Sequence, residues 1–257
     1  MSSPALYTFY YWPCPGRGVF VRSLFAFTDT AFNEASAAEI MRIKDAPFNE
    51  QPFPLRAPPF LVDHSADDFA VSQLSAVGTY VASKVGLMPD GLEKQSLALK
   101  VLSDANDVVH EMWRANACLK LNGEWVLWDQ PSWDEFRDGN FIRWLQQFEA
   151  IATKFGCTAE VGFLLGTPKA TLADLACWSL WATMARCIPQ LAPPIHEHAP
   201  LVMALCRRLE ESNAGLTALV KKDVEAWGDA WCGGLIEKSI RQVVAAGKDG
   251  KAEKSDL

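Results

Sequence analysis

A phenol and a thiol lie three residues apart near the start of the chain, in the stretch YYWPCPGRG. The phenol belongs to Tyr11 and the thiol to Cys14, where an aromatic strand is expected to give way to a helix. A helix N-terminus carries partial positive charge and free N–H groups, so it stabilises a thiolate. Cys14 at that point would have a lowered pKa and act as a nucleophile, whereas Tyr11 would donate its O–H to the sulfur of a bound thiol. The stretch alone leaves both chemistries open.

The elements that must hold this stretch follow a β-α-β and then a β-β-α order. Strands are expected at residues 5–11, 31–34, 60–63 and 69–71, with helices at residues 19–27 and 72–87. Residues 46–59 hold five prolines in fourteen positions, which excludes a regular helix or a central strand. Long helices are expected at residues 92–121, 132–155, 171–187 and 200–222.

The turn-forming sequence MPDG at residues 88–91 predicts a domain boundary. The first domain is expected at residues 1–88 and a helical second domain at residues 89–246. Residues 247–257 are polar and mixed in charge, which predicts a disordered tail.

Charge and composition exclude several classes of protein. The net charge of −7 disfavours binding to nucleic acid or to an anionic membrane, and no apolar run reaches the roughly 18 residues of a membrane span. The seven cysteines are scattered without a CxxC pair, which argues against a zinc ribbon and favours a reducing compartment, the cytoplasm. His196 and His198 are the one metal-like pair. Flanking prolines place them in an expected surface loop, and no metal site is predicted.

Four segments resemble the cytosolic glutathione S-transferase family. They are YYWPCPGRGVFVR (residues 10–22), APPFLVD (57–63), SQLSAVGTYVASKVGL (72–87) and GTPKATLADLACWSL (166–180). The first is most similar to the tyrosine-type pattern of the mu and sigma classes. The resemblance implies an α+β thioredoxin-like N-terminal domain followed by an all-α helical domain. It also implies a transferase of detoxification that uses glutathione as co-substrate, attacks a small hydrophobic electrophile and forms a homodimer in the cytoplasm.

The resemblance also sets the register of the first segment. Matching Arg22 to the family's helix arginine places Tyr11 on the catalytic tyrosine, with Trp12 beside it. Cysteine-type members resemble this chain less well, because their cysteine lies seven residues before that arginine and Cys14 lies eight before it. Tyr11 is therefore favoured, and Cys14 remains the alternative.

The resemblance assigns the cysteinyl part of glutathione to a cis-proline strand. Its backbone would pair with the tripeptide in the manner of an added strand. If Pro59 is the cis residue, the preceding Pro58 has no N–H to donate, whereas a cis Pro58 leaves Ala57 with both N–H and C=O. The second arrangement is preferred here.

The carboxylates of glutathione have further candidate partners by resemblance. Gln73 matches the residue that faces the γ-glutamyl group, but Leu74 stands where a serine or threonine is usual. Ser72 or Ser75 could supply the missing hydroxyl. Candidates for the glycine carboxylate are Arg17, Arg42 and Lys44.

Three further predictions concern residues of the expected helical domain. Asp104 or Asp107 would reach the glutathione of a neighbouring subunit, and Thr171 with Asp174 would form a capping box with a folding role. The candidates for an aromatic second-substrate pocket are Trp113, Trp227 and Trp231, while Trp178 and Trp181 are expected in the core.

Two other functions remain open. Leu74, together with Pro15 where the family often has arginine, favours a binding or scaffold protein of this fold with little catalysis. The CPGR sequence from Cys14 favours a cysteine-based thiol transferase or reductase.

Overall fold

The computed structural model describes residues 5–113, 120–121 and 124–252. Its first part is built on a four-stranded sheet with strand order β2-β1-β3-β4. The strands are β1 (Tyr7–Tyr10), β2 (Asn33–Glu34), β3 (Phe60–Asp63) and β4 (Phe69–Ser72). β1 runs parallel to β2 and antiparallel to β3, and β3 runs antiparallel to β4.

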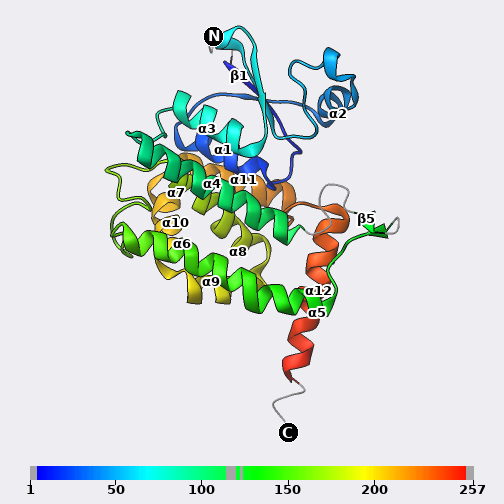
Figure 1. Ribbon diagram of the computed structural model, residues 1–257, viewed down its shortest axis with the longest axis vertical. Coiled ribbons are helices and arrows are strands. Elements are labelled where there is room, and N and C mark those ends of the chain that lie inside the picture. The colour runs from blue at the N-terminus through cyan, green and yellow to red at the C-terminus, as the bar shows by residue number, and fades with distance from the viewer. Residues whose placement is uncertain (1–4, 114–119, 122–123, 253–257) are drawn as a thin grey trace.

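Three helices accompany this sheet: α1 (Gly18–Phe27), α2 (Ala37–Asp45) and α3 (Leu74–Lys84). β3 is buried on both faces because its side chains alternate between two apolar clusters. Phe60 and Val62 pack with Ile43 of α2, whereas Leu61 joins the main core. Helices α1 and α3 pack on the main-core side of the sheet and contact α11 (Ala214–Trp227) and α4 (Leu92–Met112), so they lie between the sheet and the helical part, as Figure 1 shows.

The second part is mostly helical. Its helices are α4 (Leu92–Met112), α5 (Gln130–Phe136), α6 (Ile142–Lys154), α7 (Leu172–Cys177), α8 (Thr183–Cys187), α9 (Ala192–His198), α10 (Pro200–Ser212), α11 (Ala214–Trp227) and α12 (Gly234–Ala252). π-helical turns at Arg137–Phe141 and Trp178–Ala182 join α5 to α6 and α7 to α8, and a 3₁₀ turn occupies Pro189–Leu191. Two further 3₁₀ turns, Phe48–Glu50 and His64–Ala66, belong to the first part. A two-stranded ribbon, β5 (Lys120–Leu121) and β6 (Glu124–Trp125), interrupts the helices, so the expected all-α domain carries a small sheet.

Helix α7 runs through the middle of the helical part and is buried along its whole length. The predicted capping box at its start is present, because Thr171 and Asp174 exchange hydrogen bonds. Trp178 and Trp181 follow it and are fully buried, as expected. This helix packs against α4 and α1, which joins the two halves of the molecule into one core (Figure 1).

Several element boundaries differ from the sequence prediction. The helix expected at residues 92–121 ends at Met112, and the one at residues 200–222 breaks at Asn213, whose side chain caps α11. Three helices, α2, α9 and α12, were not predicted. His196 and His198 lie in α9 rather than in a surface loop, because Pro193 and Pro194 occupy its first turn, where proline is tolerated.

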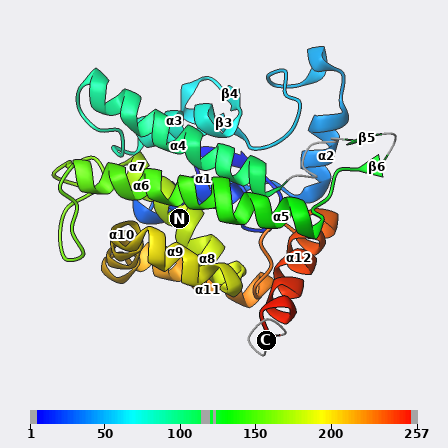
Figure 2. The same cartoon turned by 60° about the horizontal axis from the view of Figure 1, so that its bottom comes forward.

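Helix α12 continues past the expected start of the disordered tail at residue 247 and ends at Ala252. Residues 253–257 lie outside the described part of the chain. Figure 2 shows α12 standing beside α5 at one end of the helical part, and the same arrangement is seen in Figure 1. None of the helices in the described ranges is long and apolar enough to cross a bilayer.

Candidate active site

A cleft of about 510 Å³ opens where the end of β1 meets the helical part. It is lined by Tyr11, Trp12, Cys14, Arg17, Lys44, Arg56, Ala57, Pro58, Pro59, Gln73, Leu74, Asn106, His110, Trp113, Cys232 and Ile236. Most of the predicted glutathione-site residues are therefore gathered around one cavity. One side comes from the sheet-containing part, and the other comes from α4 and the start of α12.

Tyr11 is held at the base of this cleft, directly after β1. Its hydroxyl oxygen accepts a hydrogen bond of 2.8 Å from the backbone N–H of Arg17, at the start of α1. Two glycines make room for the ring. A Cβ on Gly16 would lie 2.7 Å from the Tyr11 hydroxyl, and one on Gly18 would lie 2.5 Å from ring atom Cδ1. The hydroxyl hydrogen has no acceptor in the described part of the chain and can be donated to a ligand.

The environment keeps Tyr11 protonated. Burial raises the pKa of the phenol well above its ordinary value, and the N–H of Arg17 only partly offsets that effect. Only 5% of the side chain is exposed, although the residue borders the cleft. Tyr11 is thus a neutral hydrogen-bond donor rather than a base.

Arg22 fixes the loop that carries Trp12 and Cys14. Its guanidinium is 2% exposed and donates to the carbonyl oxygens of both residues, at 2.9 and 3.0 Å. It also forms an ion pair of 3.1 Å with Glu34 of β2. The arginine used to set the sequence register is therefore a positioning residue for the strand-to-helix turn.

Cys14 borders the same cleft but lacks the features of an activated thiol. It is half-buried, and its Sγ lies 3.9 Å from the carbonyl oxygen of Cys232. Burial raises the pKa of the Cys14 thiol, against a smaller lowering by Arg22. A thiol with a raised pKa is a poor nucleophile near neutral pH.

The proline pair lies on the sheet side of the cleft together with Ala57 and Lys44. The cis bond joins Pro58 to Pro59, so the preference for a cis bond at Pro58 was wrong. The residue before the cis proline is thus Pro58, which brings a carbonyl oxygen and no N–H. Arg56 also lines the cleft, whereas Arg42, an alternative to Lys44, is exposed on α2 outside the lining.

Gln73 and Leu74 form the start of α3, and both border the cleft. Gln73 has a φ of +80°, a rare conformation for a residue with a side chain and one found at ligand-binding turns. The side chain of Leu74 is 2% exposed, so only its backbone can serve a polar ligand. Ser75, a candidate replacement for the missing hydroxyl, instead bonds to Ser103 at 3.1 Å.

Arg17 reaches across the cleft to α4. Its Nε–H donates to the side-chain oxygen of Asn106 at 2.7 Å, and its guanidinium lies 4.9 Å from the ring centre of Trp113. Asn106 and His110 face the cleft from one stripe of α4, and Trp113, directly after its last residue, continues that stripe. Asn106 and His110 were missed, although their spacing of four and then three residues to Trp113 is a helical pattern that the sequence contains.

Several predicted residues lie outside the cleft lining. Asp104 is turned away from the cleft, because its carboxylate accepts a hydrogen bond of 2.8 Å from Gln147 of α6 and pairs with Lys100. Trp227 ends α11 outside the cleft lining, and the turn after it brings Trp231 inward to pack against Trp113 at 5.2 Å. Asp107 is exposed on α4.

Cys232, just before α12, and Ile236, in its first turn, close one side of the cleft. Glu237 accepts hydrogen bonds from the N–H groups of residues 231, 232 and 233 and pairs with Arg241 at 2.7 Å. Burial alone would raise the pKa of Glu237, but these donors hold that pKa below its ordinary value. The carbonyl of Trp231 in turn accepts the N–H of Gly16 at 2.9 Å, which ties this segment to the Tyr11 loop.

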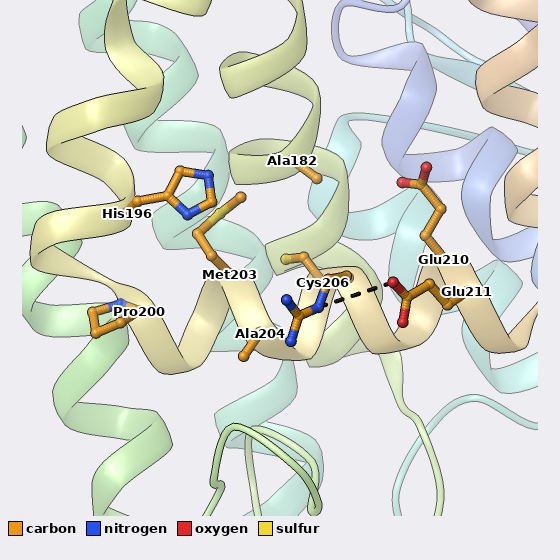
Figure 3. A pocket seen from close by; sticks show the side chains of 9 residues that line it. Ala182, His196, Pro200, Met203, Ala204, Cys206, Glu210 and Glu211 are labelled. Carbon is orange, nitrogen blue, oxygen red and sulfur yellow. Dashed lines mark ion pairs between the residues drawn. The ribbon is translucent and has the colours of Figure 1, made fainter.

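A second hollow, of about 420 Å³, lies along α9 and α10 (Figure 3). His196 and Met203 border it, and Arg207 and Glu211 pair at 4.0 Å along its edge. Cys206 is fully buried beneath it, and burial raises the pKa of its thiol. In the described ranges no cluster of three or more His, Cys, Asp and Glu side chains is arranged to hold a metal ion. The Tyr11 cleft is the stronger candidate site because it gathers most of the predicted glutathione-site residues.

Residues 97–243 match the family model described as "Glutathione S-transferase, C-terminal domain". The chain belongs to the glutathione S-transferase family. The comparison with curated proteins found no match.

Solved structures of glutathione S-transferases share this fold. The pi-class enzyme of Onchocerca volvulus is 17% identical with a TM-score of 0.66, over 86% of this chain and 95% of its own. The monomeric Na-GST-3 of Necator americanus is 20% identical with a TM-score of 0.61, over 84% and 96%. A nu-class enzyme of Haemonchus contortus is 18% identical with a TM-score of 0.59, over 84% and 96%. The mu- or sigma-like assignment stays a prediction.

Proposed function

We propose that this glutathione S-transferase binds glutathione in the Tyr11 cleft, ionises its thiol and transfers the thiolate to an electrophilic apolar substrate. The observation that carries the proposal is the Arg17 N–H to Tyr11 hydroxyl hydrogen bond of 2.8 Å. It fixes the hydroxyl oxygen and leaves the O–H hydrogen for the incoming sulfur. Accepting one hydrogen bond also polarises the hydroxyl, which strengthens it as a donor.

The sheet side of the cleft has the groups that a tripeptide with two carboxylates requires. Lys44 and Arg56 offer positive charge for the glycine carboxylate. The start of α3 at Leu74 offers N–H groups without helical partners for the γ-glutamyl carboxylate, whereas the N–H of Gln73 already donates to the Pro59 carbonyl at 3.2 Å. Ala57 and Pro58 offer backbone atoms beside the cysteinyl residue.

The reaction then needs little from the protein beyond charge stabilisation. The thiol proton passes to solvent as glutathione binds, and the thiolate accepts the Tyr11 O–H. The sulfur attacks the electrophilic carbon, the C–S bond forms, and the leaving group departs with its bonding electrons. A hydrogen bond to a charged group is worth about 1.5–3 kcal/mol. That is roughly one to two pKa units of the thiol at ~1.36 kcal/mol each.

The second substrate would lie on the α4 and α12 side, above the thiolate. Trp113 and Ile236 supply apolar surface there, and His110 and Asn106 supply polar atoms. An aromatic wall of this kind favours flat, largely apolar electrophiles.

A binding protein with little turnover is the second candidate. It is favoured by the apolar side chain of Leu74 at the start of α3 and by the engagement of the Ser75 hydroxyl with Ser103. Each lost contact to a glutathione carboxylate would weaken binding about tenfold or more. The raised pKa of Cys14 makes a cysteine-based transferase the weakest of the three.

Conjugation of glutathione to chlorodinitrobenzene separates these functions in the wild type, Tyr11→Phe and Cys14→Ser. We expect activity to fall about ten- to hundredfold in Tyr11→Phe only. Loss confined to Cys14→Ser would favour the thiol-based function. An inactive wild type that is not retained on immobilised glutathione would favour the binding protein.

A homodimer in the cytoplasm is part of this proposal and rests on the family alone. Light scattering after size exclusion gives the mass of the particle directly. A mass of twice 28.4 kDa supports the dimer, and a mass near 28.4 kDa contradicts it.

A further inference from the structure

The lining of the Tyr11 cleft has a charge opposite to that of the whole chain. The chain carries a net charge of −7, yet the lining holds the cations Arg17, Lys44 and Arg56, the titratable His110, and no aspartate or glutamate. Lys44 and Arg56 lie on the side proposed for glutathione, and Lys44 already pairs with Asp45 at 2.5 Å. Arg17 is the cation that reaches to the opposite side.

The charge of Arg17 has no anionic partner among the described residues. The guanidinium donates its Nε–H to Asn106, a neutral amide, and no other hydrogen bond of its side chain is formed in the described part of the chain. The residue is half-buried, and burial lowers the pKa of its guanidinium, although arginine stays charged. The two terminal amino groups are therefore free to hold a planar anion in a two-point contact.

Trp113 adds a second unsatisfied donor at the same place. Its side chain is 4% exposed, lies under the guanidinium of Arg17 at 4.9 Å, and has no acceptor for its indole N–H in the described residues. Buried polar groups are nearly always hydrogen-bonded, so an orphan donor beside a cleft points to a ligand acceptor.

We infer that this enzyme prefers flat apolar electrophiles that carry a carboxylate, with Arg17 binding that carboxylate. This inference rests on the proposed function and names the class of its second substrate. Asn106 acts as a positioning residue: it orients the guanidinium without neutralising it. An aspartate at this position would make the same hydrogen bond but cancel the charge that selects the anion.

A matched pair of substrates isolates the charge. A chloronitrobenzoate and its methyl ester undergo the same displacement of chloride by the thiolate of glutathione and differ in the carboxylate. The measured quantity is the ratio of kcat/KM for the acid over that for the ester, corrected for the uncatalysed rates. Wild type is compared with Arg17→Gln, with Asn106→Asp, and with the control Lys154→Gln, which removes an exposed charge at the end of α6.

We expect the ratio to fall about tenfold or more in both Arg17→Gln and Asn106→Asp and to stay within twofold in Lys154→Gln. Equal losses with acid and ester in the cleft variants would overturn the inference, because Arg17 would then serve the thiolate that both reactions share. Unfolded variants are recognised by circular dichroism, and either cleft variant suffices for the comparison.

A binding measurement separates this inference from the proposed function. The unreactive nitrobenzoate and methyl nitrobenzoate are titrated into the protein and followed by quenching of tryptophan fluorescence. Tighter binding of the acid that is lost in Arg17→Gln supports the inference even if no conjugation occurs. Equal affinity of wild type for acid and ester overturns it while leaving conjugation of neutral substrates untouched.

Discussion

The backbone N–H of Arg17 donates a hydrogen bond to the hydroxyl oxygen of Tyr11 across 2.8 Å. This contact joins the end of β1 to the start of α1, and it directs the remaining O–H hydrogen away from the backbone. Because the same residue sends its side chain to Asn106 on α4, the position of the phenol is coupled to the opposite side of the cleft.

Gly16 makes the contact possible, and Gly16→Ala should disturb it. The residue has a φ of +38°, and an added Cβ would lie 2.7 Å from the Tyr11 hydroxyl. We expect conjugation to fall about tenfold, as expected for a lost or misdirected hydrogen bond of ~1.4 kcal/mol. Gly86→Ala is the control, because Gly86 has a φ of +76° with no atom within 4 Å of an added Cβ. An equal loss in both variants would show that backbone strain alone is responsible.

The pH dependence of conjugation should reflect the thiol and not the phenol. Burial raises the pKa of Tyr11 above its ordinary value, so the phenol remains a donor where an exposed tyrosine ionises, near pH ~10. At saturating glutathione, we expect kcat/KM for the electrophile to rise as the bound thiol ionises and then to stay level through pH ~10. A fall of kcat/KM at that pH in a protein still folded would contradict the assignment.

Cys14 should react slowly with alkylating reagents. Because burial raises the pKa of its thiol, the rate of modification by iodoacetamide should still be rising above pH ~8.5, where an ordinary thiol begins to level off. Peptide mass spectrometry distinguishes Cys14 from the other cysteines. A rate that is already level at neutral pH would indicate a thiolate and revive the cysteine-based function.

Glu237 should stabilise the segment that closes the cleft. We expect Glu237→Gln to lower the free energy of unfolding by about 2 kcal/mol at neutral pH, since charge-assisted hydrogen bonds are lost. Glu225→Gln removes an exposed pair with Lys221 and should cost about 0.5 kcal/mol or less.

The stabilising contribution of Glu237 has a defined pH dependence. Because the pKa of Glu237 is held below its ordinary value, its contribution is fully present above pH ~4.3 and is lost as the pH falls through the lowered pKa. The melting temperatures of wild type and Glu237→Gln should therefore converge in acid. A constant difference down to pH ~3 would contradict this role.

The elements with strong local signals were predictable from the sequence. Strand β3 begins and ends where predicted, because an apolar run stands directly between Pro59 and a charged segment. The capping box of Thr171 and Asp174 was also found correctly. Helix α2 was missed although it has an equivalent box at Ser36 and Glu39, so that signal was available. Helix α12 begins at the second of two glycines and was missed although Ile236, Ile240, Val243 and Val244 have helical spacing, so that signal was also available.

The site was only partly predictable. Tyr11, Gln73 and Leu74 follow from local motifs, and the cleft contains all three. Arg56, Cys232 and Ile236 come together only through packing of the two halves of the molecule, which no local pattern reveals. The cis bond between Pro58 and Pro59 likewise depends on the surrounding structure, because both prolines satisfy the sequence motif equally.

The pKa of the glutathione thiol bound to wild type and to Tyr11→Phe tests the central claim most directly. Thiolate absorbance in the ultraviolet, recorded against pH at saturating glutathione, gives this value, and calorimetry confirms that both proteins bind the tripeptide. We predict a wild-type thiol pKa one to two units below the ordinary value of about 8.5, and a return towards that value in Tyr11→Phe. The same thiol pKa in both proteins would contradict the account.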